Sequence, residues 1–295
     1  MKFLPGWARQ ALIRAGRDFF GPRAAALRRE WPEDQSGLSV HMVVGHSMLP
    51  MGLLALRSWE FHTQRRWRLV VHEDGSFSPA DRANLDKHFP EARIIDRAAA
   101  DAEVQAGLRD FPACWRHRAN HNWFLKVFDT RHYARGERYI IVDSDIVFFR
   151  RPARVLEWTD HMSDQMWIME DEREKYSHAR ADIERAMGVR MVRRGNSGLD
   201  LMNKAAADLA LADKFLGACG NSARQYEFLE QTIFSLWVSS WGKGGLLPSD
   251  EYEISWNNFR GSRAVCRHYI GPAKHDALYV EGAPVFWWQS RPAWP

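Results

Sequence analysis

The sequence predicts an α/β domain with a mostly parallel central sheet flanked by helices, and three observations support this class. Apolar runs that suit strands alternate with helical segments through the first half of the chain, which is the pattern of parallel β-α-β units. Hydrophobic residues make up 45% of the 295 residues, enough for the core of one large domain. The run from Tyr139 to Val142 is short, β-branched and uninterrupted, as in a strand buried on both faces.

Each element before that strand is marked by a local signal. The segment Met51 to His62 has an apolar helical face, and the helix that begins at Ser78 has a serine cap followed by proline. That helix runs to about His88, because Pro90 stops it. The other expected elements are strands at Leu38 to Val44, Trp67 to His72 and Ala92 to Ile95, and a helix from about Asn120 to Ala134.

The second half mixes elements less regularly. Met166 to Met169 reads as a strand, and Met191 to Met202 as strand and loop with Asn196-Ser197-Gly198 in its middle. Helices are expected at Ser177 to Met187, Lys204 to Leu216 and Gln225 to Ser240. The sequence after them predicts strand and loop, ending in Trp287-Trp288 and a proline-rich tail.

The first 36 residues are predicted to form a basic helical extension of a single domain over residues 37–295. Six arginines lie between Trp7 and Trp31 against two acidic residues, with apolar residues between them. This segment fits either a basic helix on an anionic membrane surface or a helix packed on the domain with its basic face in water. Gly21-Pro22 is expected to interrupt any single helix there.

Charge and cysteine content narrow the classes of function. The formal net charge of +4 suits an anionic ligand or surface, and no DNA- or RNA-binding motif is present, so no nucleic-acid partner is expected. Cys114, Cys219 and Cys266 form no Cys-x-x-Cys pair, which favours a reduced, cytoplasmic compartment. No apolar stretch reaches transmembrane length, and the N-terminus lacks the long apolar region of a signal peptide.

Two carboxylates, Asp143 and Asp145, directly follow the buried strand. Along an extended chain they point to the same side, where they repel each other unless a cation lies between them. Carboxylate oxygens favour Mg²⁺ or Mn²⁺, and ligands of open α/β sheets bind at the carboxyl ends of strands. The pair therefore predicts a metal site, with a solvated turn as the alternative.

Four sequence motifs follow one another along the chain, and we call them landmarks. They are Lys126, Asp143-Ser144-Asp145, the segment Asn196 to Asn203 that contains Asp200, and an H-x-x-G-x-x-K motif from His268 through Gly271 to Lys274, with Glu230-Gln231 before the last. This order resembles nucleotide-sugar glycosyltransferases of the GT-A (type-A, Rossmann-like) fold, and most closely the family-eight retaining galactosyl- and glucosyltransferases. The resemblance spans about residues 40–274. The sequence departs from it at His275-Asp276, at Glu230 in place of Asp, and at Gly45-His46.

The resemblance implies a role for each landmark. Asp143, Asp145 and His268 would hold the metal, and Gly271 and Lys274 would contact the donor phosphates. Lys126 would contact phosphate or sugar, Gly45 and Ser144 would lie in the nucleotide site, and Asn196 and Asp200 would bind sugar hydroxyls. Glu230 and Gln231 would lie near the reacting carbon, where Glu230 either stabilises positive charge in a retaining reaction or acts as base in an inverting one.

The predicted function is transfer of a hexose from a nucleotide-diphosphate sugar, with a UDP-sugar as the expected donor, to a carbohydrate or glycolipid acceptor, as in cell-surface polysaccharide or lipopolysaccharide synthesis. Mn²⁺ or Mg²⁺ is the expected cofactor. The competing interpretations are a sugar-phosphate nucleotidyltransferase, for which Gly45-His46-Ser47 is a poor phosphate loop, and an inactive GT-A protein that binds carbohydrate. A serine hydrolase is not expected, since no G-x-S-x-G motif is present.

Overall fold

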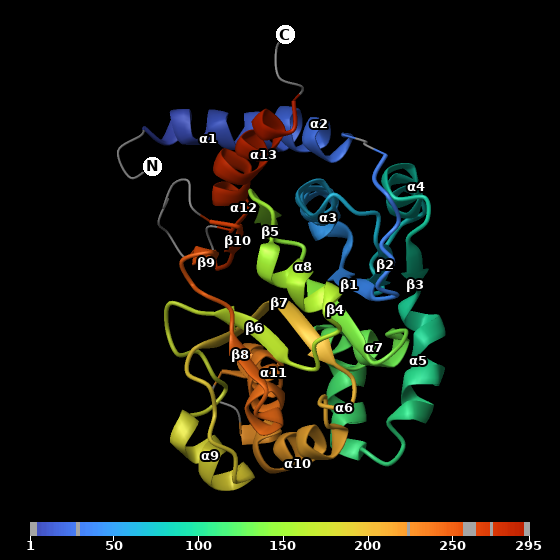
Figure 1. The fold of residues 1–295 in the computed structure, drawn as a ribbon, viewed down its shortest axis with the longest axis vertical. Coiled ribbons are helices and arrows are strands. Elements are labelled where there is room, and N and C mark those ends of the chain that lie inside the picture. Colours follow the sequence, from blue (N-terminus) through green and yellow to red (C-terminus); the bar gives the residue numbers. More distant parts are fainter. Residues whose placement is uncertain (1–4, 28–29, 223–224, 256–263, 272–273, 292–295) are drawn as a thin grey trace.

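The computed structural model describes residues 5–27, 30–222, 225–255, 264–271 and 274–291. These residues form a central sheet of seven strands and a second sheet of three (Figure 1). The central sheet has the order β3-β2-β1-β4-β7-β6-β8, with β1 (Ser39–Val44), β2 (Arg68–Glu73), β3 (Arg93–Ile95), β4 (Arg138–Val142), β6 (Met166–Glu170), β7 (Gly195–Asn203) and β8 (Gly244–Leu246). The small sheet has the order β5-β10-β9, with β5 (Ile146–Phe148), β9 (Tyr252–Ser255) and β10 (Cys266–Tyr269).

Strand pairing confirms the mostly parallel central sheet. β1 pairs in parallel with β2 and β4, β2 with β3, and β6 with β8. β7 is the exception, because it runs antiparallel between β4 and β6. Since β1 and β4 are parallel neighbours, their carboxyl ends meet at one edge of the sheet. Gly45 follows β1 and Asp143 follows β4 at this edge.

Helices cover both faces of the central sheet, and each face has its own apolar core (Figure 1). Tyr139 and Ile141 of β4 face one core while Ile140 and Val142 face the other, as the two-residue period of a strand requires. The first core includes side chains of α5 (Arg97–Gly107), α6 (Pro112–Asn120), α7 (Trp123–Tyr133), α9 (Arg180–Met187), α10 (Leu209–Cys219) and α11 (Leu229–Trp241). The second includes those of α3 (Leu49–Thr63), α4 (Pro79–His88) and α8 (Ala153–Asp160).

Several helix starts follow the local chemistry of the sequence. The Ser78 hydroxyl accepts a hydrogen bond from the Asp81 N–H at 3.3 Å, and the Asp81 carboxylate accepts one from the Ser78 N–H at 2.8 Å. This reciprocal pair is a capping box, so the predicted serine cap of α4 is confirmed. Between β3 and β6, the helices α5, α6 and α8 were not predicted. α5 begins at the cap residue Asp96, which accepts from the Ala99 N–H at 3.1 Å.

A third group of helices packs at one end of the molecule (Figure 1). It contains α1 (Gly6–Ala15), the π-helix η1 (Gly16–Phe20), α2 (Gly21–Ala25), α12 (Lys274–Ala277), the π-helix η5 (Leu278–Gly282) and α13 (Ala283–Gln289). We call these elements the helical layer. Leu278 and Phe286 of this layer share a small core with Val147 of β5 and Tyr269 of β10. No helix among the described residues is both long enough and apolar enough to cross a membrane.

The helical layer corrects two predictions. The strand and loop expected at the C-terminus is wrong for residues 274–289, which are helical. The interruption expected at Gly21-Pro22 is also wrong, because helical structure continues from Gly6 to Ala25. The wide π-turn before Pro22, in which the Gly21 N–H bonds to the Gly16 carbonyl, makes room for a residue that lacks an N–H.

Candidate functional site

The site begins at the turn that joins β4 to β5. The Asp143 N–H donates to the Gly198 carbonyl of β7 at 2.9 Å, and the Asp145 carbonyl accepts from the Tyr269 N–H of β10 at 2.9 Å. The Ile146 N–H closes the turn on the Asp143 carbonyl at 3.3 Å. The two aspartates therefore lie on a turn held between the two sheets, and this turn, not the alternation of an extended strand, brings their carboxylates together.

His268 of β10 completes a cluster with these carboxylates. Its Nε2 lies 3.0 Å from Asp145 Oδ1 and 3.7 Å from Asp143 Oδ2. One ligand atom from each of the three residues lies within 4.8 Å of the others, and among the described residues this is the one such group of acidic, histidine or cysteine side chains. The structure thus brings together the three residues predicted to bind a metal.

A chain of hydrogen bonds fixes which nitrogen of His268 carries the proton. The Gln231 amide donates to the Lys175 carbonyl at 2.7 Å, so Gln231 Oε1 is free to accept from Asn196 Nδ2 at 3.0 Å. Asn196 Oδ1 then accepts from the Gly198 N–H at 3.0 Å, and it lies 3.0 Å from His268 Nδ1. Because this oxygen can only accept, His268 Nδ1 must donate, and Nε2 faces the two carboxylates.

The donor set fits a hard divalent cation. A neutral imidazole would direct the Nε2 lone pair at two carboxylates, which is unfavourable unless a cation lies between them. Two ligands at right angles on an ion with bonds of about 2.1 Å lie about 3.0 Å apart, and Nε2 lies 3.0 Å from Asp145 Oδ1. The Nδ1 hydrogen bond to a carbonyl oxygen is the usual outer support of a metal-binding histidine. Mn²⁺ or Mg²⁺ suits this mixture of oxygen and nitrogen ligands.

Lys126 of α7 neutralises the inner side of the cluster. Its ammonium group lies 2.7 Å from Asp143 Oδ1 and 3.2 Å from Glu230 Oε1, and it donates to the Ser197 carbonyl. Burial alone would lower the pKa of Lys126, but the carboxylates of Asp143, Glu230 and Asp200 outweigh burial and raise it. Lys126 is therefore a buried cation that ties β4, β7 and α11 together.

The predicted residues of α11 and β7 occupy different depths. Glu230 and Gln231 start α11, and burial raises the pKa of the Glu230 carboxyl while Lys126 opposes that change. Asp200 is fully buried, and neither of its carboxylate oxygens has a hydrogen-bond partner in the described structure. It lies on the sheet face that α7 and α11 cover, so the structure places it inside the core, behind Lys126.

A cleft of about 340 Å³ opens beside the cluster, and Gly45, Ser144 and Asp145 line it together with Lys126 and Glu230. Asp74, at the end of β2, and Trp123, which begins α7, line it as well and were not among the predicted residues. Trp123 is 52% exposed. A side chain at Gly45 would overlap the Asp74 carboxylate unless that carboxylate moved.

Asp171 is a third residue that was not among the predicted site residues. It directly follows β6, is buried, and lies 3.4 Å from Asn196 Nδ2. An acidic residue at the end of a predicted strand was the signal that could have identified it. In the middle of the H-x-x-G-x-x-K motif, Gly271 adopts a positive φ of 74° shortly after β10. Lys274 begins α12, but its side chain lies outside the described residues.

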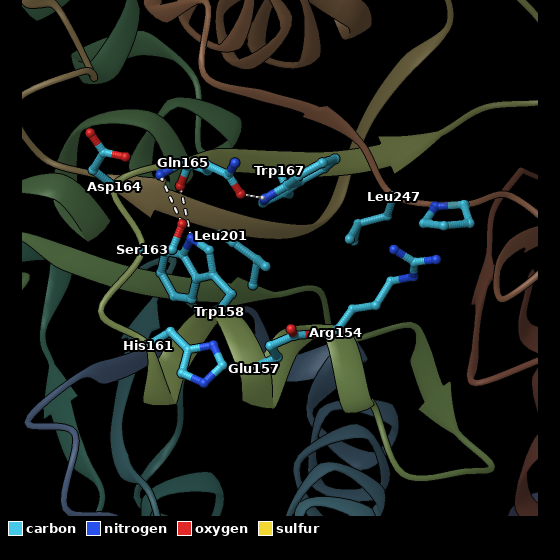
Figure 2. A pocket seen from close by; sticks show the side chains of 11 residues that line it. Arg154, Glu157, Trp158, His161, Ser163, Asp164, Gln165, Trp167, Leu201 and Leu247 are labelled. Carbon is cyan, nitrogen blue, oxygen red and sulfur yellow. Dashed lines mark hydrogen bonds between the residues drawn. The ribbon is translucent and has the colours of Figure 1, made fainter.

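Other hollows in the described structure contain none of the predicted site residues. Figure 2 shows one of about 350 Å³ between α8 and the start of β6, where the indoles of Trp158 and Trp167 both donate hydrogen bonds to Gln165. Another, of about 670 Å³, is lined by Trp67 and Phe89, which precede β2 and β3 and so mark the opposite edge of the sheet. The cleft beside Asp143 is therefore the candidate site.

Comparison with solved structures identifies the fold. The galactosyltransferase LgtC, in complex with donor and acceptor sugar analogs, shares 17% identity with a TM-score of 0.54 over 87% of this chain and 97% of its own. Mouse xyloside xylosyltransferase 1 shares 14% identity with a TM-score of 0.53 over 80% of this chain and 98% of its own. The bifunctional glycosyltransferase WbbM shares 13% identity with a TM-score of 0.53 over 88% of this chain and 52% of its own.

The chain has the GT-A glycosyltransferase fold. No protein-family model matches the sequence. No curated protein sequence matches it either. At identities of 13–17%, the likeness concerns the GT-A fold alone, and the chemistry of this chain has to be argued from its own residues.

Proposed function

We propose that this protein is a metal-dependent hexosyltransferase that moves a sugar from a nucleotide-diphosphate sugar to a carbohydrate or glycolipid acceptor. The observation that carries the proposal is the Asp143–Asp145–His268 cluster, which lies beside a cleft at the carboxyl end of β4. The solved neighbours of the fold are glycosyltransferases, which supports the same reaction class. A UDP-sugar is the proposed donor, and synthesis of a cell-surface polysaccharide or lipopolysaccharide is the proposed setting.

Residues of the cluster would act on the diphosphate that leaves the sugar. Bound Mn²⁺ or Mg²⁺, held by Asp143, Asp145 and His268, would supply positive charge that offsets the charge developing on the leaving group. Lys126 would hold Asp143 in position, since its ammonium group lies 2.7 Å from that carboxylate. We propose that the Gly271 backbone and the Lys274 side chain complete the phosphate contacts, and that Gly45 and Ser144 border the nucleotide.

Glu230 and Gln231 are the proposed residues next to the reacting carbon. Glu230 is half-buried beside the cleft, and its ion pair with Lys126 keeps the carboxylate fixed at 3.2 Å. A fixed carboxylate suits stabilisation of positive charge on the sugar ring better than it suits a base that must accept a proton. Together with the family-eight resemblance, this supports retention of configuration. Proton NMR of the first-formed product would test it, because an inverted anomer would contradict the assignment.

The central experiment measures metal-dependent nucleotide binding by thermal shift. The wild-type protein is heated with UDP-, GDP-, CDP- and ADP-sugars, each with and without Mn²⁺. Ligand at about a hundred times its Kd should stabilise the folded state by about 2.7 kcal/mol, which corresponds to a shift of several degrees. We expect a shift with UDP-sugar that requires the metal, and its loss in D143N, D145N and H268A.

Asp110 provides the matched control, because its side chain is 78% exposed and it lies outside the cluster. The D110N variant should bind nucleotide like the wild type. Equal, metal-dependent shifts in D143N and the wild type would refute the site assignment. Release of pyrophosphate from a nucleoside triphosphate and a sugar phosphate would instead identify a nucleotidyltransferase, and nucleotide binding without transfer or donor hydrolysis would identify an inactive binding protein.

The three cysteines bear on the proposed cytoplasmic location. Cys114, Cys219 and Cys266 are all free thiols, and Cys114 and Cys266 are buried. Burial raises the pKa of both buried thiols, so neither is a reactive thiolate at neutral pH. We propose a reducing compartment for a chain with this cysteine content. Fractionation of cells that express the full chain would test it, since recovery with secreted proteins would contradict the proposal.

A further inference from the structure

Exposed apolar side chains concentrate in the helical layer. Among the described residues, five of the seven large hydrophobic side chains that remain exposed belong to it. They are Trp7, Leu12, Phe19, Val285 and Trp288, whereas Trp123 and Met162 lie elsewhere. Trp7 is 77% exposed and Trp288 is 68% exposed. Indole rings this exposed are unusual on the surface of a protein that contacts only water, and their clustering indicates an interaction surface.

The N-terminal and C-terminal helices form this surface as one unit. The ring of Trp287 packs against Phe19 and Phe20, with ring centres 6.1 and 5.2 Å apart. Gly16 lies so close to the Tyr279 backbone carbonyl that any side chain there would overlap it. In Figure 1, α1 and α2 run along one end of the molecule and α13 crosses them. Trp7 and Trp288 are therefore presented by a packed helical layer, although they are far apart in the sequence.

The same layer carries most of the net charge of the protein. Residues 6–25 and 274–291 contain six arginines or lysines and three acidic residues, a formal charge of +3 compared with +4 for the whole chain. Asp18 pairs with Arg17 at 2.7 Å, and Asp276 pairs with Arg9. The third acid, Glu281, is buried. The exposed residues of the layer thus include both basic side chains and aromatic or aliphatic ones.

We propose that the helical layer docks the protein on a membrane that contains anionic phospholipids. Tryptophan is the side chain that prefers the boundary between headgroups and acyl chains, and arginine binds anionic headgroups. Helices that bind in the plane of a membrane combine these two features. The layer also packs against β10 through Tyr269, the residue after His268. Docking would place the metal cluster close to a membrane, where a lipid-linked acceptor would be reached.

Vesicle flotation of the full chain tests the proposal. The probes are vesicles of 30% phosphatidylglycerol in phosphatidylcholine and vesicles of pure phosphatidylcholine. We expect the wild type to float with the anionic vesicles and to bind much more weakly to the neutral ones or at high salt. W7A and W288A should each lower the partition coefficient by about tenfold or more. R14Q and R23Q should each lower it by about fivefold, the equivalent of one headgroup contact.

Matched controls distinguish binding through this surface from nonspecific adsorption to vesicles. M162A removes a side chain that is 76% exposed but lies at the end of α8, and R109Q removes one that is 80% exposed outside the layer; both should float like the wild type. D143N should float normally as well, so failure of the proposed chemistry would not affect this test. Absence of flotation, or equal losses in M162A and W7A, would overturn the proposal. A dimer in sedimentation velocity that W7A dissociates, without flotation, would assign the surface to a second copy of the chain.

Discussion

Replacement of Asp200 by leucine should stabilise the protein at neutral pH. Asp200 is fully buried and neither carboxylate oxygen accepts a hydrogen bond within the described structure. Burial raises the pKa of this carboxyl well above its ordinary value of 3.8, and Lys126 only partly opposes the change. If the folded protein keeps Asp200 protonated at pH 7, proton uptake on folding lowers the free energy of unfolding by up to about 4 kcal/mol. D200L removes this cost and leaves Lys126 paired with Asp143 and Glu230.

The pH dependence gives the sharper test. Between pH 3.8 and the folded-state pKa, the unfolded chain binds fewer protons at Asp200 than the folded chain, so the contribution of Asp200 to wild-type stability falls as the pH rises. We therefore expect D200L to gain about 1–4 kcal/mol at pH 7 and little at pH 4. Urea unfolding at both values measures this, and each kcal/mol corresponds to roughly 2–4 °C in Tm. An advantage that is absent at pH 7, or equal at both values, would refute the reasoning.

Asp129 provides the opposite case for comparison. It is as buried as Asp200, but its carboxylate binds the Arg118 guanidinium through two hydrogen bonds, of 2.8 and 3.0 Å. D129L should therefore destabilise by about 3–5 kcal/mol, because the buried Arg118 guanidinium keeps only its contact with the half-exposed Asp101. Sugar transfer by D200L tests the predicted role of Asp200 in sugar binding. A stabilised variant that has lost turnover would mean that the buried carboxyl is retained for function.

Three further predictions follow from single contacts. S78A removes the cap of α4 and should cost about 1 kcal/mol, measured by urea unfolding; an unchanged midpoint would contradict the capping assignment. G198A places a methyl group on the ring of His268 and should weaken Mn²⁺ binding measured by calorimetry, whereas wild-type affinity would show that the ring can move freely. Burial lowers the pKa of His72 from 6.5 to about 3, so the unfolded chain binds more protons at His72 between these values. The contribution of His72 to stability should therefore fall by about 2 kcal/mol from pH 7 to pH 5. On going from pH 7 to pH 5, H72L should lose about 2 kcal/mol less than the wild type, and parallel pH profiles would contradict this assignment.

The central sheet could be predicted because its strands are buried on both faces. Such strands read as continuous apolar runs, and all five residues of β4 are indeed buried. The C-terminal helices could not be predicted in this way. Gly282 and Pro284 suggest loop structure, yet the chain there is helical because Leu278 and Phe286 pack into a core with β5, β10 and α3. Tertiary packing outweighs local propensity in this segment.

The site residues could be selected from the sequence, but their contacts could not. The order of the landmarks led to Asp143, Asp145 and His268, which the structure brings together. Asn196 was expected to bind a sugar, and that role stays a prediction. The structure adds that its side-chain carbonyl orients His268, a contact that depends on the amide of Gln231 in α11. Such a chain of donors and acceptors exists only once the fold has placed its members, so no sequence pattern could indicate it.

The electrostatic state of the site also arises only from the fold. Asp143, Glu230 and Asp200 come together around Lys126, and Asp145 adds a second negative charge beside Asp143. Burial raises the pKa of Asp143, Glu230 and Asp200. Folding thus collects more negative charge than Lys126 offsets, and a divalent cation at the outer edge would recover part of the cost. We therefore expect Mn²⁺ alone, without nucleotide, to raise the Tm of the wild type and to do so less in D145N. An equal rise in both would mean that the charge is balanced by protons within the cluster, and that the metal arrives only with the donor diphosphate.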